Sequence, residues 1–536
     1  MIARVVTRLL QALAVIVAAS ILVAAVHDVS TTWDVWYYHL PFAARSTRLV
    51  GPDAYAFHAT NQARYDGFPL LAERLQGLLW RLTGRPESGN LVAFGALAAF
   101  VAWLRRAHRV PLHLAALALL AVPLVQLHAS SCYIDLPSNL AAAALVIQVL
   151  RLYAVPEPAS ERTLFRILAL AAVVVNMRFQ LHPLTALCLV AAAPRVLPPL
   201  WRAPSRRPLL LAALALPIVF AAPLYNLAVH HNPYYPMKLS LLGITFPGPE
   251  GVYSNAPPYL EHTPRPLRWL YSVLEIGIRP FSERRRWTID QWAPEGLTAN
   301  RMGGFFGAYA VIQVALLVWL AARDPSRRAR RSALGFGVLT AFTAMWPQSH
   351  ELRYYMYWMI VLVALNLILL AERDDAARIE PAVGVVCAAA LGVVLWVTEA
   401  GYAYPSGSTF AELLRDKVDA RILDRIKDGD CICVRKEPWT FLYAAPFHAP
   451  RRYAVKESEK REDCRRLPLG GVTSPRRAGG QSRTATAADT GAGGGHPSRR
   501  GRGISPRRRS APRDQKAPWG APYKALAPFT SFVVST

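Results

Sequence analysis

Acidic residues and cysteines are scarce in this sequence. Of its 536 residues, 35 are Asp or Glu and only 18% are charged, whereas about a quarter of a soluble protein is charged. The six cysteines do not form a disulfide framework, and neither a Cys-x-x-Cys nor a His-Glu-x-x-His segment occurs. These absences exclude a small disulfide-stabilised domain and a recognisable zinc site, and they argue against a water-soluble enzyme.

Long apolar blocks accompany the low charge. Hydrophobic residues make up 53% of the chain and gather in blocks, many of which approach the roughly 20 helical residues that cross a hydrocarbon core. We therefore predict an all-α integral membrane protein with about eleven transmembrane helices. The predicted spans are 9–26, 89–104, 112–128, 138–153, 164–177, 183–199, 209–228, 304–322, 333–346, 356–371 and 382–398.

Arginines gather in alternate loops between these blocks. Three lie in 105–109 and five in 323–331, whereas 129–137 has no Lys or Arg. Because cytoplasmic loops carry the excess of Lys and Arg, we expect a cytoplasmic N-terminus and a periplasmic C-terminus. The pattern predicts a multi-pass protein of the bacterial inner membrane.

Two of the predicted outer loops are too long to be simple connectors. The first covers 27–88 and the second 229–303, and the second is rich in Pro, Tyr and Trp. The first contains leucines at helical spacing, which predict an amphipathic helix either on the outer leaflet or packed on the second loop. These leucines are Leu71, Leu75, Leu78, Leu79 and Leu82, and Glu73 lies off their stripe.

The sequence divides into three predicted regions. Residues 1–400 form the transmembrane module, and 404–464 form a small periplasmic α/β appendage with a helix in Phe410–Lys427 and a strand at Cys431–Val434. Residues 465–536 hold fourteen Lys and Arg against two Asp, and we expect a basic, disordered tail. Since the remaining positive charge lies mostly in short loops, we expect no nucleic-acid partner.

Two acidic residues lie where predicted spans meet the outer side. Asp34 follows the first span within Thr32-Trp-Asp-Val-Trp-Tyr-Tyr-His-Leu-Pro41, and Asp135 precedes the fourth within Tyr133-Ile-Asp-Leu-Pro137. Ionisable groups at membrane depth are expensive and mark functional sites. Two carboxylates on one side of the membrane suggest acid/base chemistry, whereas helix N-capping is the alternative for Asp135.

The order and placement of these segments, with Gly67-Phe-Pro-Leu70 between them, resemble the GT-C superfamily. This superfamily comprises membrane glycosyltransferases that use polyprenyl-phosphate sugars, including protein O-mannosyltransferases and aminoarabinose transferases. The resemblance covers about residues 1–400. It implies a GT-C fold, with Asp34 as general base and Asp135 as the second acidic residue that orients the acceptor or supports Asp34. No motif indicates a cofactor, and a divalent metal ion bound with these carboxylates stays open.

Cations at the same rim suit a phosphate. Arg178 ends the fifth span, and Arg353, followed by Tyr354, precedes the tenth in an arrangement similar to an Arg-Tyr motif of the superfamily. A guanidinium binds phosphate bidentately, although snorkelling to lipid headgroups is the alternative. His39 and His182 are further candidates to bind phosphate or sugar, against the alternative of structural hydrogen bonding.

These residues predict an inverting transfer of sugar from a polyprenyl-phosphate donor to an envelope acceptor, which is a lipid, glycan or protein. A transporter or flippase of lipid-linked sugars is one alternative, although its expected midplane charges and internal repeats are not evident. A non-catalytic subunit of an envelope complex is another. The sequence identifies neither the sugar nor the acceptor.

Overall fold

The computed structural model describes residues 2–154, 160–202, 205–241, 243–251, 256, 260–277, 286–289, 303–324, 327–398 and 402–458. The predicted tail of residues 465–536 lies outside this part of the chain. So do most of the second predicted outer loop after residue 277 and the end of the predicted appendage.

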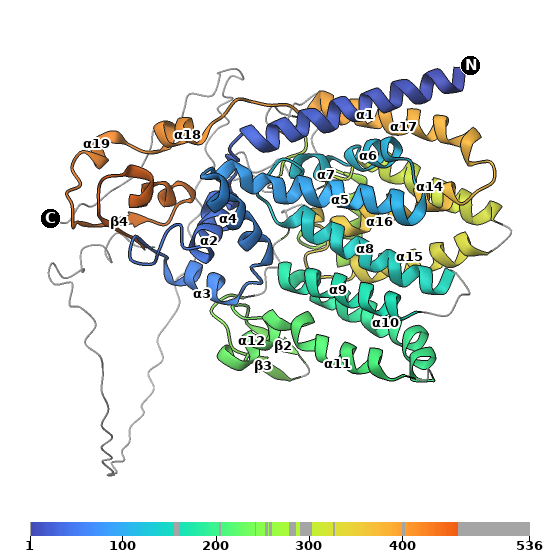
Figure 1. Ribbon diagram of the computed structural model, residues 1–536, viewed down its shortest axis with the longest axis horizontal. Helices are drawn as coiled ribbons and strands as arrows, with labels where there is room; N and C mark the ends of the chain where they lie inside the picture. Colours follow the sequence, from blue (N-terminus) through green and yellow to red (C-terminus); the bar gives the residue numbers. More distant parts are fainter. Residues whose placement is uncertain are drawn as a thin grey trace, which may run out of the picture.

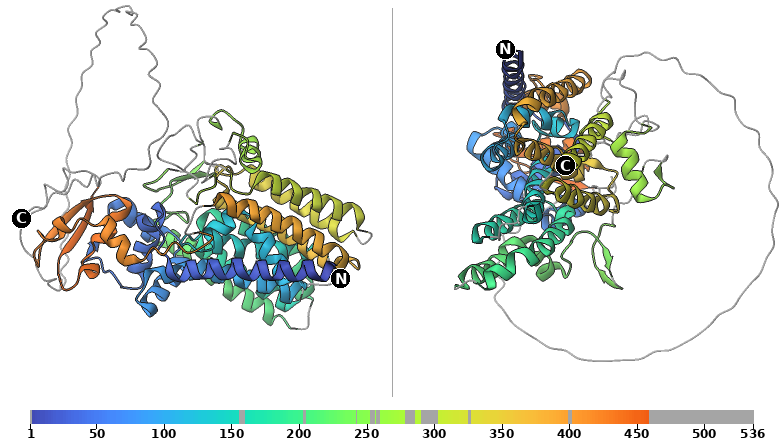
Figure 2. Two further views of the ribbon diagram at one scale, coloured as in Figure 1. Left: turned by 90° about the horizontal axis from the view of Figure 1, so that it is seen from above. Right: turned by 90° about the vertical axis from the view of Figure 1, so that its right-hand side faces the viewer.

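Long helices form most of the molecule and run side by side (Figures 1 and 2). The bundle consists of α1 (Ile2–His27), α5 (Leu91–His108), α6 (Leu112–Leu120), α7 (Pro123–His128), α8 (Asp135–Ala154), α9 (Glu161–Met177), α10 (His182–Trp201), α11 (Arg207–Val219), α12 (Ala221–His230), α14 (Gly307–Arg323), α15 (Arg328–Ala344), α16 (Met356–Ala371) and α17 (Ala376–Val397). Each predicted apolar block coincides with one of these helices or with a broken pair. Pro123 begins the second helix of one pair, α6–α7.

Fewer helices are long enough to span a membrane than the sequence predicts. Within the described residues, five are long and apolar enough, and a sixth is formed if α11 and α12, bent by 57°, make one span. Several others have 16 or 17 residues, which corresponds to about 25 Å of helix against about 30 Å of hydrocarbon. The predicted count of eleven spans is therefore not confirmed. Helix α16 is buried from Met356 to Leu370 and lies at the centre of the bundle's apolar core.

The remaining elements gather at the end of the bundle opposite the N-terminus (Figure 1). They belong mainly to the first predicted outer loop and to the predicted appendage. The first loop contains the π-helix η1 (Val35–His39), α2 (Leu40–Ser46), β1 (Tyr55–Ala56), α3 (Ala59–Gly67), α4 (Leu71–Thr83) and the 3₁₀ helix η2 (Pro86–Asn90). The appendage contains α18 (Phe410–Lys417), α19 (Ala420–Leu423), β4 (Cys431–Arg435), the 3₁₀ helices η6 (Pro438–Tyr443) and η7 (Ala445–His448), and β5 (Ala454–Ser458).

The predicted appendage shares a sheet with the first loop. Strand β5 pairs in parallel with both β4 and β1, with Tyr55 opposite Val455, so residues 400 positions apart in the chain lie side by side. Side chains of both segments form one apolar cluster. The strand expected at Cys431–Val434 is confirmed, whereas the expected helix is broken into α18 and α19. Thr409 and Glu412 close a capping box at the start of α18.

Helix α4 exposes its apolar face and buries its polar face, which is the reverse of an amphipathic helix on a soluble protein. Leu75, Leu78 and Leu82 of the predicted stripe are 40%, 48% and 73% exposed, whereas Glu73 and Gln76 are buried. An exposed leucine face and a buried polar face suit a helix in contact with lipid. The alternative that this stripe packs on the second loop stays untested, because much of that loop lies outside the described residues.

The described part of the second predicted loop is tied to the first. It contains β2 (Leu239–Leu241), which pairs with β3 (Ile244–Phe246), and α13 (Arg265–Leu274). Arg64 on α3 forms a bidentate ion pair with Glu250, with Nε–Oε1 and Nη2–Oε2 distances of 2.7 and 2.8 Å. Further along, the carboxylate of Glu275 accepts hydrogen bonds from Trp287 Nε1 and from the backbone N–H groups of Gly304 and Phe306. These bonds connect the loop to the start of α14.

Candidate active site

A cavity of about 280 Å³ opens where the bundle meets the first loop. Its walls come from η1, α3, the ends of α9 and η3 (Phe179–Leu181), and the 3₁₀ helix η5 (Leu352–Tyr355). Four of the six predicted site residues line it, namely Asp34, His39, Arg178 and Arg353. Phe68 and Pro69, from the segment that carries part of the family resemblance, line it as well.

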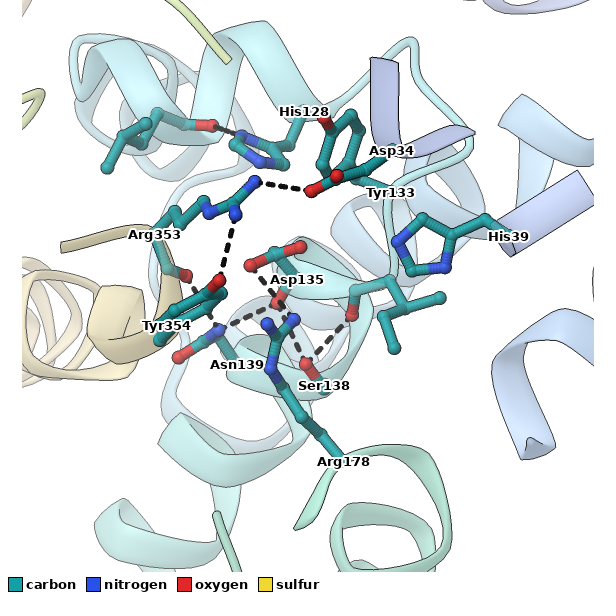
Figure 3. A network of polar contacts seen from close by, with 12 residues as sticks. Asp34, His39, His128, Tyr133, Asp135, Ser138, Asn139, Arg178, Arg353 and Tyr354 are labelled. Carbon is teal, nitrogen blue, oxygen red and sulfur yellow. Dashed lines mark hydrogen bonds and ion pairs between the residues drawn. The ribbon is translucent and has the colours of Figure 1, made fainter. Parts of the chain in front are cut away.

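Asp34 and Arg353 form an ion pair across the cavity (Figure 3). Their Oδ2 and Nη1 atoms are 3.0 Å apart, and the Asp34 side chain is 19% exposed. Asp34 precedes η1, where i→i+5 hydrogen bonding widens the turn, and Tyr38 and His39 reach the same cavity. Burial raises the pKa of the Tyr38 phenol well above its ordinary value, and Asp34 adds to this shift, so Tyr38 is a neutral hydroxyl.

Asp135 and Arg178 form a second, more deeply buried pair. Asp135 Oδ1 lies 2.8 Å from Arg178 Nη1, and the two side chains are 2% and 7% exposed. Arg178 lines the cavity and Asp135 does not; Figure 3 shows Asp135 between Arg178 and the Asp34–Arg353 pair. Asn139, one turn further along α8, donates to the backbone oxygens of Asp135 and Arg353 at 2.7 and 3.3 Å. This amide therefore joins the two acid–arginine pairs.

Tyr354 lies between the two guanidinium groups. The Cζ atoms of Arg178 and Arg353 are 4.6 and 4.8 Å from its ring centroid, and Arg353 Nη2 donates to its hydroxyl at 2.8 Å. Cation–π contact and hydrogen bonding hold both cations in place. The Nε–H group of Arg178 makes no hydrogen bond within the described residues and is therefore an unused donor. A bound anion at this wall would meet two fixed, permanently charged groups.

The two predicted histidines occupy different environments. His39 lines the cavity and its Nδ1 lies 3.0 Å from Oε1 of the buried Glu73. His182 begins α10, and its Nε2 donates to the backbone oxygen of Val175 at 2.8 Å. The structure thus does not bring His182 to the cavity. The sequence does not predict Glu73 as a site residue, because its only local signal is a position off the leucine stripe.

An apolar groove adjoins the cavity. It has a volume of about 660 Å³ and lies between α4, α5, α8 and α9. Leu75, Leu78 and Leu79 of α4 form one wall, and Met177 lines both the groove and the polar cavity. A ligand with a charged head and a long apolar tail could occupy both spaces at once.

The residues at the cavity do not fit a metal site. Within the described part of the chain, no three His, Cys, Asp or Glu side chains lie together as metal ligands would. Asp34 and Asp135 each contact an arginine, whose positive charge opposes a second cation. We therefore assign no step to a divalent ion, and the metal that the sequence left open stays untested.

Comparison with known proteins gives little further guidance. No protein-family model matches the chain, and no curated protein matches it. Among solved structures, the chain is similar to ArnT from Cupriavidus metallidurans in the apo state, with 16% identity and a TM-score of 0.41. The likeness covers 73% of this chain, which spans 64% of the length of that ArnT chain. At this distance the likeness carries no argument about the chemistry.

Proposed function

We propose that this protein transfers a sugar from a polyprenyl-phosphate donor to an acceptor hydroxyl or amine of the cell envelope. The observation that carries this proposal is the pair of arginines that line one cavity, each ion-paired with a carboxylate from a distant segment. The resemblance in the first 400 residues supports the same reaction class. Under this proposal the cavity faces the periplasmic side of the inner membrane.

The two arginines suit the phosphate of such a donor. When the bond between the sugar and the phosphate breaks, negative charge develops on the phosphate oxygens, and fixed guanidinium groups stabilise it. Asp135 holds Arg178 through one ion pair, and Asp34 holds Arg353 through the other. In this arrangement the carboxylates position the cations, and the predicted role of Asp34 as general base stays a prediction.

The apolar groove suits the polyprenyl tail. It begins at Met177, next to Arg178, and is lined almost entirely by aliphatic and aromatic side chains. A polyprenyl chain leaving a phosphate bound at Arg178 would pass directly into it. The exposed leucines of α4 would then lie against the same leaflet from which the donor enters.

Purified protein incubated with radiolabelled polyprenyl-phosphate sugar and a membrane extract as acceptor source tests the proposal. We expect transfer of label, with loss of about 10²–10³-fold in Arg178→Lys and Arg353→Lys, because lysine keeps the charge but loses the planar fork. Arg373→Ala is the matched control, since the Arg373–Asp375 pair lies near the surface beyond the opposite end of α16 from Arg353. Movement of the donor across vesicles without any transfer would refute the proposal in favour of a flippase.

A further inference from the structure

Glu73 and His39 form a buried acid–histidine pair that the proposed function has not used. Their side chains are 1% and 2% exposed, and Glu73 Oε1 lies 3.0 Å from His39 Nδ1. When the Glu73 carboxylate is ionised it can only accept a hydrogen bond, and Nδ1 is then the donor. This contact places the ring proton on Nδ1 and leaves the lone pair of a neutral imidazole on Nε2.

The burial of Glu73 needs a reason. Glu73 Oε2 makes no hydrogen bond within the described residues, so His39 is the hydrogen-bonding partner of this carboxylate there. A buried carboxylate with one partner is costly to fold. The other buried residues of α4 are the apolar Ala72, Gly77 and Trp80 and the amide Gln76, which donates to the backbone oxygen of Cys132.

His39 Nε2 is directed into the site. It makes no hydrogen bond within the described residues, and Figure 3 shows the ring edge pointing towards the space between Asp34 and Asp135. The aromatic rings of Tyr38 and Tyr133 pack against the imidazole at centroid distances of 4.3 and 5.5 Å and fix its plane. Several charged and titratable groups surround the imidazole. Glu73 lies on α4, Asp34 and Tyr38 lie just before and within η1, and Tyr133 and Asp135 lie where α8 begins. The guanidinium groups of Arg178 and Arg353 lie across the cavity.

The other candidate proton acceptors are committed to other contacts. Asp34 and Asp135 are ion-paired with arginines at 3.0 and 2.8 Å. Glu351 accepts a hydrogen bond from Gln348 at 3.5 Å. An imidazole is also intrinsically more basic than a carboxylate by roughly 2 pKa units, which places it nearer to neutral pH.

We propose that His39 Nε2 accepts the proton of the acceptor hydroxyl or amine during sugar transfer, and that Glu73 positions and polarises His39; this inference rests on the proposed function. The acceptor oxygen or nitrogen forms a bond to the anomeric carbon as the bond from this carbon to the phosphate oxygen breaks. The bonding electron pair leaves with the polyprenyl phosphate, held by Arg178 and Arg353. The acceptor proton moves to Nε2, and the imidazolium is stabilised by the Glu73 carboxylate until the proton passes to water.

His39 is a catalytic residue in this scheme, and Glu73, which does not reach the cavity, is a positioning residue. The test compares steady-state transfer by wild type, His39→Gln, Glu73→Gln and Asp34→Asn across pH. We expect His39→Gln to lower kcat by about 10²–10⁴-fold, with the donor KM within about twofold of wild type. Glu73→Gln should lower kcat less and move the acidic limb of the pH–rate profile to lower pH, because the imidazolium loses its counter-charge.

Asp34→Asn provides the contrasting variant. We expect it to raise the donor KM, because Arg353 loses the carboxylate that holds it, while the acidic limb of the profile stays in place. The inference is overturned if His39→Gln retains wild-type kcat, if Glu73→Gln leaves the acidic limb unmoved, or if the donor KM alone rises in His39→Gln, which would make the histidine a phosphate ligand. Should His39→Gln fail to fold, the isosteric Glu73→Gln decides the question alone. Absence of transfer by the wild type refutes the proposed function itself, and is thereby distinguished from failure of this inference.

Discussion

The pair formed by Asp135 and Arg178 offers the most direct test of the site's architecture. Both side chains are almost fully buried, at 2% and 7% exposure, and their charged atoms are 2.8 Å apart. Removing one partner of such a pair leaves an uncompensated buried charge, which typically costs about 3–5 kcal/mol. Arg353 also lies near the carboxylate, so we expect Arg178→Met to cost about 3 kcal/mol, at the lower end of this range.

The double variant carries the decisive information. Asp135→Asn alone leaves the Arg178 guanidinium with cation–π contact to Tyr354 but without its carboxylate. In Asp135→Asn/Arg178→Met neither charge remains, and we expect the double variant to lose about 2–3 kcal/mol less than the sum of the two single losses, which is the coupling energy of the pair.

Reversible denaturation of the detergent-solubilised protein measures these differences, followed by tryptophan fluorescence. Arg373→Ala is the control, because Arg373 pairs with Asp375 on the surface, where the side chains are 24% and 45% exposed. An exposed pair is worth less than about 1 kcal/mol. If the two single effects add in the double variant to within about 0.5 kcal/mol, the two side chains do not act as a buried pair and the described site is wrong.

Two further predictions concern the elements that carry the site. Gly77→Ala should destabilise the packing of α4 on α2 by about 1–3 kcal/mol, because the added Cβ would lie 2.3 Å from the backbone oxygen of Ala43. The control is Gly337→Ala, whose added Cβ would meet no atom within 4 Å. It should leave the thermal unfolding midpoint unchanged or raised. Burial raises the pKa of Glu457 despite hydrogen bonds from the His58 backbone and the Asn61 side chain. The folded state therefore binds this proton more readily than the unfolded state, so stability should fall as pH rises from about 4.5 through the raised pKa. Amide exchange in β5 between about pH 4 and pH 7 measures this slope, which should vanish in Glu457→Gln and would contradict the assignment if it persisted there.

The helices and the charged rim residues could be predicted from the sequence. Apolar blocks have a strong signal because few folds tolerate them outside a membrane or a large core. Asp34 and Arg353 stand out for a related reason, since a charge beside an apolar span is rare. The number of membrane-crossing helices could not be predicted in the same way, because hydropathy does not reveal where a block such as α6–α7 breaks.

Long-range partners could not be predicted at all. No local pattern indicates that Asp34 pairs with Arg353, 319 positions away, and Asp135 with Arg178. The same holds for β1, which has two residues and too little periodicity to be recognised as a strand, although it joins the first loop to β5. These contacts depend on how the bundle brings its ends together, and that information is distributed over the whole apolar core.

Glu73 shows how a correctly identified pattern can leave out a residue of the site. The leucine stripe of α4 was recognised, and on a soluble protein such a stripe faces the core and the opposite side faces water. In α4 the order is reversed, since Leu82 is 73% exposed while Glu73, off the stripe, is 1% exposed; this arrangement suits a helix whose leucines meet lipid. A polar residue opposite the leucines therefore points into the protein, where the acid can reach His39. The arrangement that leaves the leucines of α4 exposed therefore also places Glu73 inside the protein, in contact with a histidine that lines the cavity.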